Sequence, residues 1–106
     1  MPKYLIAGHY GPEGVKGLLK EGGSNRRAVV EKAIKSVGGK VDAFYYAFGD
    51  TDLYAIVDMP DNVSLTAVGL VINSSGAASM KTTVLITPEE VDEAAKKTLT
   101  YRPPGQ

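Results

Sequence analysis

The stretch that decides the fold is residues 41–61, VDAFYYAFGDTDLYAIVDMPD. Residues 41–48 are rich in aromatic side chains and residues 53–59 in aliphatic ones, and both kinds favour a pleated strand. Between them, Gly49 and Asp50 suit a tight turn of the kind in which a positive φ is tolerated. The stretch therefore predicts a β-hairpin with a structural turn at Gly49 and Asp50.

The two faces of this hairpin follow from the alternation of side chains along a strand. If Phe48 pairs with Thr51, one face carries Phe44, Tyr46, Phe48, Leu53, Ala55 and Val57. The other face carries Val41, Ala43, Tyr45, Ala47, Asp52, Tyr54 and Ile56. Neither face alternates apolar with polar as a solvated hairpin does, so we expect both faces to be covered.

Polar atoms enter the second face through Tyr45, Asp52 and Tyr54. A few polar groups on an apolar wall are typical of a ligand site, so these residues are candidates for ligand binding. The alternative is structural: a strand tyrosine packs with its hydroxyl satisfied, and an aspartate after a turn serves the turn. The sequence leaves both interpretations open.

Length and composition narrow the function classes. A chain of 106 residues predicts a single domain over residues 1–106 with one modest core. Twelve acidic residues balance twelve basic ones, so we expect neither a nucleic-acid partner nor a membrane partner. No stretch has the length of a transmembrane helix or the pattern of a signal peptide, and the absence of cysteine fits a cytoplasmic protein. With one histidine and no cysteine, we expect no metal site and no cofactor.

Along the chain, residues 3–10 predict a first strand. A helical region follows before the hairpin, which the pair Gly22-Gly23 interrupts and the pair Gly38-Gly39 ends. Residues 62–75 predict a helix that is apolar nearly all round, which suggests that one side of it faces another subunit. Residues 77–86 predict a fourth strand, residues 88–99 a last helix, and residues 100–106 a Pro-rich tail. The fold class is therefore α+β, ferredoxin-like β-α-β-β-α-β with a C-terminal helix, and the strand order is 4-1-3-2.

This topology brings His9, the turn at Gly49 and Asp50, and Asp52 to one end of the sheet. It leaves open whether His9 and Asp52 share a face. Both are candidates for a catalytic base, with Tyr45 or Tyr54 as the hydrogen-bond donor to a developing oxyanion.

The segments AFYYAFGDTDLYAIVDMPDN and KTTVLITPEEVDEA, together with the N-terminal MPKYLI, resemble the GYD-domain family of small bacterial proteins. The most specific part is the turn with Gly49 and Asp52, followed by an apolar strand and Met-Pro-Asp. Family members usually carry Tyr before this Asp, where the present chain has Thr51, so a role of that Tyr does not transfer. The family is similar in fold to dimeric α+β barrels, which implies a homodimer or higher homo-oligomer in which two sheets face one another.

Three functions remain open. The first is a small-molecule-binding or sensing module, with the ligand held between the sheet and its helices or the partner chain. The second is a cofactor-independent oxygenase or isomerase acting on a small aromatic or lactone-like substrate. The third is a structural assembly protein. We rank them in this order, with a small-molecule ligand and a second copy of the chain as the expected partners.

Overall fold

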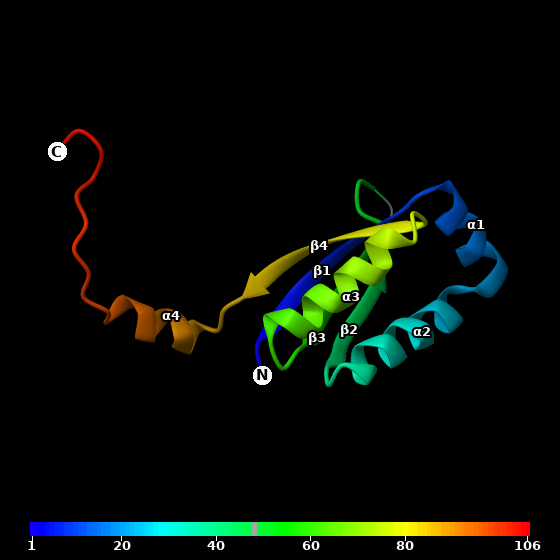
Figure 1. The fold of residues 1–106 in the computed structure, drawn as a ribbon, viewed down its shortest axis with the longest axis horizontal. Coiled ribbons are helices and arrows are strands. Elements are labelled where there is room, and N and C mark those ends of the chain that lie inside the picture. The colour runs from blue at the N-terminus through cyan, green and yellow to red at the C-terminus, as the bar shows by residue number, and fades with distance from the viewer. Residues whose placement is uncertain (48) are drawn as a thin grey trace.

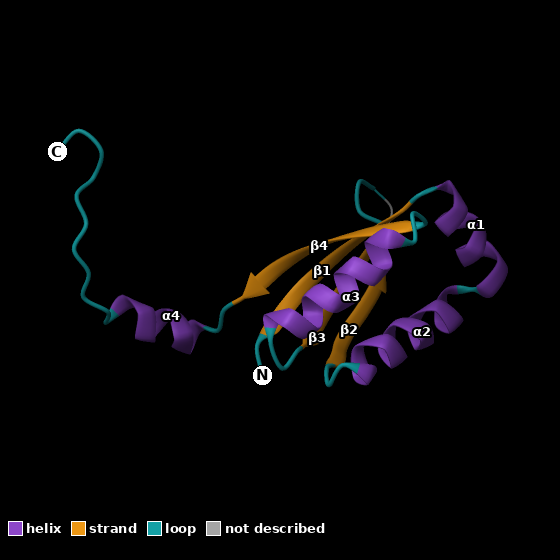
Figure 2. Ribbon diagram, viewed as in Figure 1, coloured by secondary structure: helices purple, strands orange, loops and turns teal. Residues whose placement is uncertain are grey.

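The computed structural model describes residues 1–47 and 49–106 and forms two layers, a sheet and the helices that cover it (Figures 1 and 2). The elements follow in the order β1 (Lys3–Tyr10), α1 (Pro12–Glu21), α2 (Gly23–Ser36), β2 (Lys40–Tyr46), β3 (Leu53–Asp58), α3 (Asn62–Ser74), β4 (Ala78–Leu85) and α4 (Pro88–Ala95). The predicted order of strands and helices is confirmed, and the first helical region is interrupted at the predicted glycine pair, where Gly22 has a φ of 85°.

The sheet has the strand order β2-β3-β1-β4, which is the predicted order read from its other edge. All three strand pairs are antiparallel. Helices α2 and α3 lie across one face of the sheet, and the opposite face carries no helix (Figure 1). This is the ferredoxin-like arrangement, with β1 and β3 at the centre and β2 and β4 as edges.

The predicted hairpin forms, and its register is as expected from Tyr46, which pairs with Leu53, to Ala43, which pairs with Ile56. The register then shifts between Val41 and Ala43, so that Val41 lies opposite Val57. The prediction that Val41 shares a face with Ala43 was wrong. A bulge adds one residue to the strand and reverses the side on which the preceding side chain points. The assumed pairing of Phe48 lies outside the described residues.

The core lies between the sheet and helices α2 and α3. Its buried members are Tyr4, Ile6, Ile34, Ala55, Val57, Met59, Leu65 and Val68. Ile6 and Ala55 pair across β1 and β3, which places the helix-facing side chains of the two central strands at the middle of the core. The side chains between them in sequence therefore point to the face that the helices leave open.

The C-terminal segment leaves this body. Helix α4 and the tail after it extend beyond the end of β4 (Figure 1), and α4 ends at Ala95, earlier than predicted. The radius of gyration is 17.0 Å, whereas a compact chain of this length has about 13 Å. Within the described residues, none of the helices combines the length and the apolarity needed to cross a membrane.

Candidate functional site

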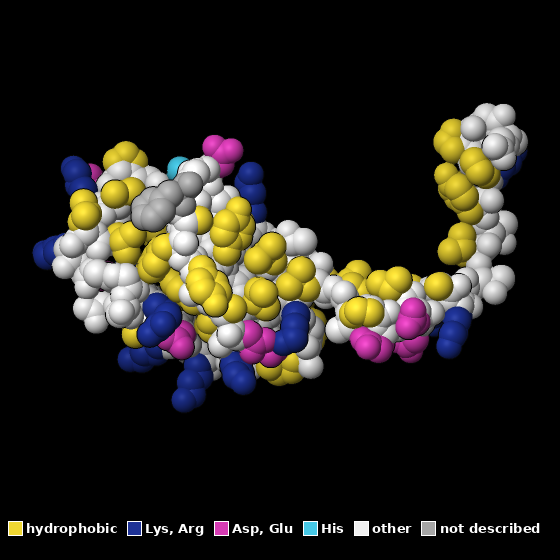
Figure 3. Space-filling view, turned by 180° about the vertical axis from the view of Figure 1, so that it is seen from behind, with side chains coloured by type: hydrophobic (Ala, Val, Ile, Leu, Met, Phe, Trp, Pro, Cys, Tyr) yellow, Lys and Arg dark blue, Asp and Glu magenta, His cyan; other side chains and the backbone are white. Residues whose placement is uncertain are grey.

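The uncovered face of the sheet carries the residues that the sequence singled out. Hydrophobic side chains gather over the middle of this face and charged ones lie along its margin (Figure 3). The strand register places the side chains in rows across it. One row contains Tyr45, Tyr54, Ala7 and Lys81, and the next contains Ala43, Ile56, Leu5 and Thr83.

His9 and Asp52 meet at the end of this face. Asp52 directly precedes β3, and its backbone N–H donates to the carbonyl of Gly8 at 2.9 Å. Its Oδ2 accepts the backbone N–H of Tyr10 at 2.8 Å and lies 3.1 Å from Nδ1 of His9. The structure thus answers the question that the sequence left open, since the two side chains are in contact.

The contact has a chemical consequence for His9. The carboxylate lies beside Nδ1, and within the described residues Nε2 has no hydrogen-bond or ion-pair partner. The His9 side chain is 63% exposed, so Nε2 is accessible to a ligand. Across the described part of the chain, no cluster of three or more His, Asp or Glu side chains is arranged to hold a metal ion.

A hollow of about 280 Å³ adjoins this pair and is lined by Ala7, Gly8, His9, Asp50, Thr51, Ser79 and Lys81. The sequence interpretation missed Ser79 and Lys81. Ser79 lies opposite His9, and Lys81 lies opposite Ala7, on the edge strand β4. The predicted strand order already placed the fourth strand beside the first, but only the register shows which of its residues face His9. Lys81 forms no ion pair with any residue that the structure describes.

Tyr45 and Tyr54 lie opposite each other on β2 and β3. Tyr45 is 71% exposed and Tyr54 is 42% exposed. Tyr54 is two residues after Asp52, on the same side of the strand and about 7 Å further along it. These two rings therefore continue the face from the hollow toward the middle of the sheet.

The turn residues occupy the connection between β2 and β3. Asp50 lines the hollow, whereas a Cβ at Gly49 would meet nothing within 4 Å. Among the described residues, positive φ occurs at Gly22, Gly38, Gly76 and Gly105. The φ of Gly49 is defined by the carbonyl carbon of Phe48, so this feature of the predicted turn lies outside the described residues.

The opposite end of the open face carries one lysine that forms ion pairs with two aspartates. Nζ of Lys3 donates to the carboxylate of Asp42 and, at 2.8 Å, to Oδ1 of Asp58. These hydrogen bonds raise the pKa of Lys3, and the bond from Lys3 lowers the pKa of Asp42. Because this lysine is already neutralised by two acids, Lys81 is the more available cation of the face.

A second, larger hollow of about 570 Å³ lies on the helix side, between α3 and helices α1 and α2. Its walls are mostly apolar and include Leu18, Val30, Val68 and Ile72. None of the four predicted ligand-binding residues lines it. The predicted site residues are thus gathered on the other face of the sheet.

The match to known families accords with this architecture. A family model of the GYD domain matches residues 4–95. The chain belongs to the GYD-domain family. The match runs from β1 to the end of α4, so it includes the whole open face and also the projecting helix. Comparison with curated proteins and with solved structures finds no match.

Proposed function

We propose that this GYD-domain protein binds a small planar molecule that carries an acidic oxygen, and that it does so on the open face of its sheet. The observation that carries the proposal is the hollow at the end of this face, which His9 and Lys81 both line and where His9 also contacts Asp52. The exposed rings of Tyr45 and Tyr54 continue the same face.

Each part of the face suits one part of such a ligand. A tyrosine ring offers an apolar surface on which a planar molecule stacks, and its hydroxyl offers a hydrogen bond. The ammonium of Lys81 and the imidazole of His9 are partners for an acidic oxygen, and bonds to a charged group are stronger than neutral ones. Asp52 orients His9 through the contact at Nδ1.

A second copy of the chain would enclose this site. The middle of the open face is apolar, with Leu5, Ala7 and Ile56 from the two central strands. The likeness of the family's fold to dimeric α+β barrels supports an assembly in which two such faces meet. In that assembly the ligand lies between the sheet of one protomer and the partner, shielded from water.

A catalytic function is the second candidate, and the His9–Asp52 contact is the observation that favours it. With its proton on Nδ1, His9 presents Nε2 as a general base. Lys81 or a tyrosine hydroxyl then stabilises the oxyanion that forms when a proton leaves an aromatic or lactone-like substrate. Ser79 lies opposite His9, but its hydroxyl makes no hydrogen bond within the described residues, so a serine nucleophile is not favoured.

The test is a thermal-shift screen of aromatic acids, phenols and lactones, followed by titration of each hit. We expect hits among aromatic acids and phenols. Lys81→Ala and Asp52→Asn should each weaken binding by about tenfold, which corresponds to about 1.4 kcal/mol. Lys35→Ala is the matched control, because Lys35 is an exposed lysine of α2 on the helix side.

Three outcomes separate the candidates. Equal shifts for all variants across every hit would contradict the site on the open face. Turnover of a bound hit that His9→Gln abolishes, while binding persists, would establish the enzyme. The absence of any hit would favour the structural assembly protein.

A further inference from the structure

The C-terminal arm, which we define as residues 86–101, exposes apolar side chains that its own domain does not cover. Ile86, Val91, Leu99 and Tyr101 are each more than half exposed. In the space-filling view, hydrophobic side chains likewise line one side of the projecting segment (Figure 3). Large exposed apolar groups gathered on one segment mark an interaction surface rather than a solvated tail.

Helix α4, within the arm, is built to be helical but is too short to be stable alone. Thr87 and Glu90 form a complete capping box, and a proline occupies the first turn. Isolated helices shorter than about 12 residues are marginal in water, and α4 has 8. Because the family match includes α4, this helix belongs to the domain and needs a surface against which to pack.

One side of α4 is suited to that packing. Val91, Ala94 and Ala95 are spaced at i, i+3 and i+4, which places them on one face of the helix. The four acidic residues of α4 occupy the remaining arc, where they stay in water. The arm therefore presents one narrow apolar stripe with small side chains, which fits a shallow groove.

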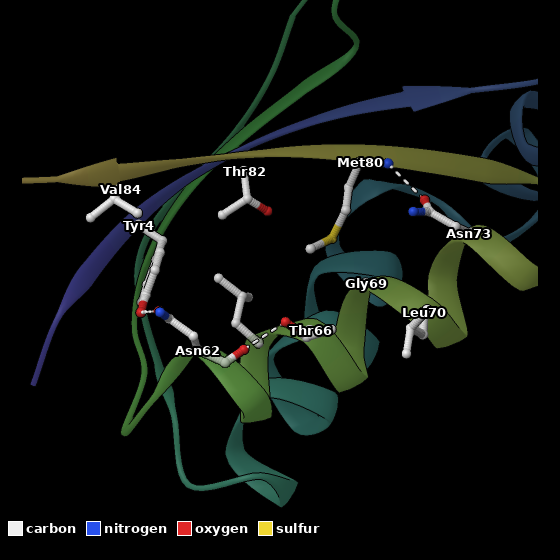
Figure 4. A pocket seen from close by; sticks show the side chains of 10 residues that line it. Tyr4, Asn62, Thr66, Gly69, Leu70, Asn73, Met80, Thr82 and Val84 are labelled. Atoms are coloured by element: carbon white, nitrogen blue, oxygen red, sulfur yellow. Dashed lines mark hydrogen bonds between the residues drawn. The ribbon is translucent and has the colours of Figure 1, made fainter.

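A groove of this kind lies between α3 and β4, with a volume of about 360 Å³ (Figure 4). Leu70 on α3 and Val84 on β4 form exposed apolar walls, and Met80 reaches over Gly69. A Cβ at Gly69 would stand 3.2 Å from Cε of Met80, so the glycine leaves room for the Met80 side chain to pack closely against α3.

One amide oxygen at each end of the groove already accepts a hydrogen bond. The hydroxyl of Tyr4 donates to Oδ1 of Asn62 at one end, and Oδ1 of Asn73 accepts the backbone N–H of Met80 at the other (Figure 4). An apolar occupant therefore leaves these two amide oxygens paired. The lengths also agree: α4 is about 12 Å long. The four residue steps from Met80 to Val84 span about 14 Å.

The direction of the arm indicates whose groove it occupies. The arm continues outward from the end of β4, with Ile86 and Thr87 between β4 and α4, and so points away from its own groove (Figure 1). A two-fold axis near Ile86 would set the β4 strand of a second copy antiparallel to the first. Each arm would then run back along the α3–β4 groove of the other copy, which is the self-complementary contact of a two-fold dimer.

A further hollow at the root of the arm supports this placement. It has a volume of about 490 Å³ and is lined by Pro2, Val84, Ile86 and other residues of the root. Val84 also lines the α3–β4 groove. The apolar surface is therefore continuous from the point where one arm leaves to the place where the partner's arm would lie.

We propose that two copies of this chain exchange their C-terminal arms, with α4 of each copy packed into the α3–β4 groove of the other. The occupant is a second copy of the same chain. This interface is separate from the open face of the sheet, because the groove lies on the helix side. The interface also covers β4, an edge strand whose exposed backbone is otherwise open to unwanted pairing.

Site-specific cross-linking tests the exchange, because the chain has no cysteine of its own. One preparation carries Val91→Cys and a second carries Leu70→Cys, both at exposed positions where the fold tolerates the change. The two are unfolded together, refolded as a mixture, and oxidised. Docking raises the effective concentration of the two thiols, so we expect about tenfold more linked pairs than in a control mixture of Val91→Cys and Lys32→Cys.

Each outcome decides the proposal. A linked pair of twice the chain mass, formed in the first mixture and not in the control, supports arm exchange. A double variant that carries Val91→Cys and Leu70→Cys in the same chain tests whether the arm packs onto the groove of its own chain. A disulfide within single chains, even when they are diluted, would show that the arm folds back onto its own groove and would overturn the proposal. Equal or no linking in the two mixtures would overturn it as well.

Discussion

The Nδ1 atom of His9 lies 3.1 Å from Oδ2 of Asp52, and the same oxygen accepts the backbone N–H of Tyr10 at 2.8 Å. One carboxylate thus satisfies the backbone at the end of β1 and orients the only histidine of the chain. The structural and functional interpretations of Asp52 are therefore not exclusive. The two roles can be separated by variants that remove either the acceptor oxygen or only the negative charge of this side chain.

Asp52→Ala should destabilise the protein, because the N–H of Tyr10 loses its acceptor. For a partly buried donor, the expected loss in the free energy of unfolding is about 1 kcal/mol or more. Asp52→Asn keeps an acceptor oxygen at nearly the same place, so its loss should be smaller than about 0.5 kcal/mol. Urea denaturation of the three proteins measures both values. If Asn were as damaging as Ala, the charge rather than the acceptor would be the stabilising feature.

The ion pair between Lys3 and Asp42 should make stability depend on pH in a defined window. The pKa of Asp42 lies below its usual 3.8 in the folded chain, so its contribution is present above that value and is lost as the pH falls through the lowered pKa. The pKa of Lys3 lies above its usual 10.5, so its contribution is present below that value and is lost as the pH rises through the raised pKa.

Replacement of Lys3 tests this predicted pH dependence of stability. We expect the melting temperature of Lys3→Met to fall below that of the wild type between about pH 5 and 9, and the difference to shrink near pH 2. High salt should shrink it too, because the pair is exposed and is screened. Lys32→Met, a change of the same kind on the exposed side of α2, should show no such pH dependence. A difference that persists unchanged at pH 2 would assign the effect to the lost side chain and not to its charge.

Much of the fold could be predicted from the sequence because the side chains of the central hairpin follow a clear two-residue alternation. The alternation around Phe44 and Ala55 predicts which residues share a face, and the strand register confirms that grouping from the Ala43–Ile56 pair to the Tyr46–Leu53 pair. Val41 was placed wrongly because a bulge carries no signature in the residues around it. The end of the last helix was placed too late, since α4 ends at Ala95 and the prediction ran to Leu99.

The candidate site was only half predictable. Topology alone brought His9 and Asp52 to one end of the sheet, but their contact depends on the rotamers of both side chains. Ser79 and Lys81 were missed because the pairing register of β4 with β1 has no local signal in the sequence. In physical terms, strand order follows from connection rules, whereas register depends on the packing of the whole sheet.

Two glycines provide a matched test of close packing. A Cβ at Gly39 would lie 2.5 Å from Sδ of Met59 and 2.8 Å from the carbonyl oxygen of Asp58. Gly39→Ala should therefore cost about 1–3 kcal/mol, as overpacked core positions do. Gly49→Ala should cost less than about 0.5 kcal/mol, because its Cβ would meet nothing within 4 Å. Chemical denaturation decides the matter, and a loss at Gly49 equal to that at Gly39 would show that the turn needs glycine for its backbone.

The proposed pairing of two open faces predicts the effect of a charge placed on this surface. Tyr45 stands 71% exposed in the single chain, so Tyr45→Lys should leave the protomer folded. In a face-to-face dimer the new lysine would be buried without a partner, which is costly and should weaken association by about 100-fold or more. Leu19→Lys is the control, because Leu19 is an exposed apolar residue of α1 on the helix side. Sedimentation equilibrium of both variants measures the effect, and the arm-deleted forms of both separate it from arm exchange. A Tyr45→Lys protein that associates as tightly as Leu19→Lys in the arm-deleted background would show that the open faces do not meet.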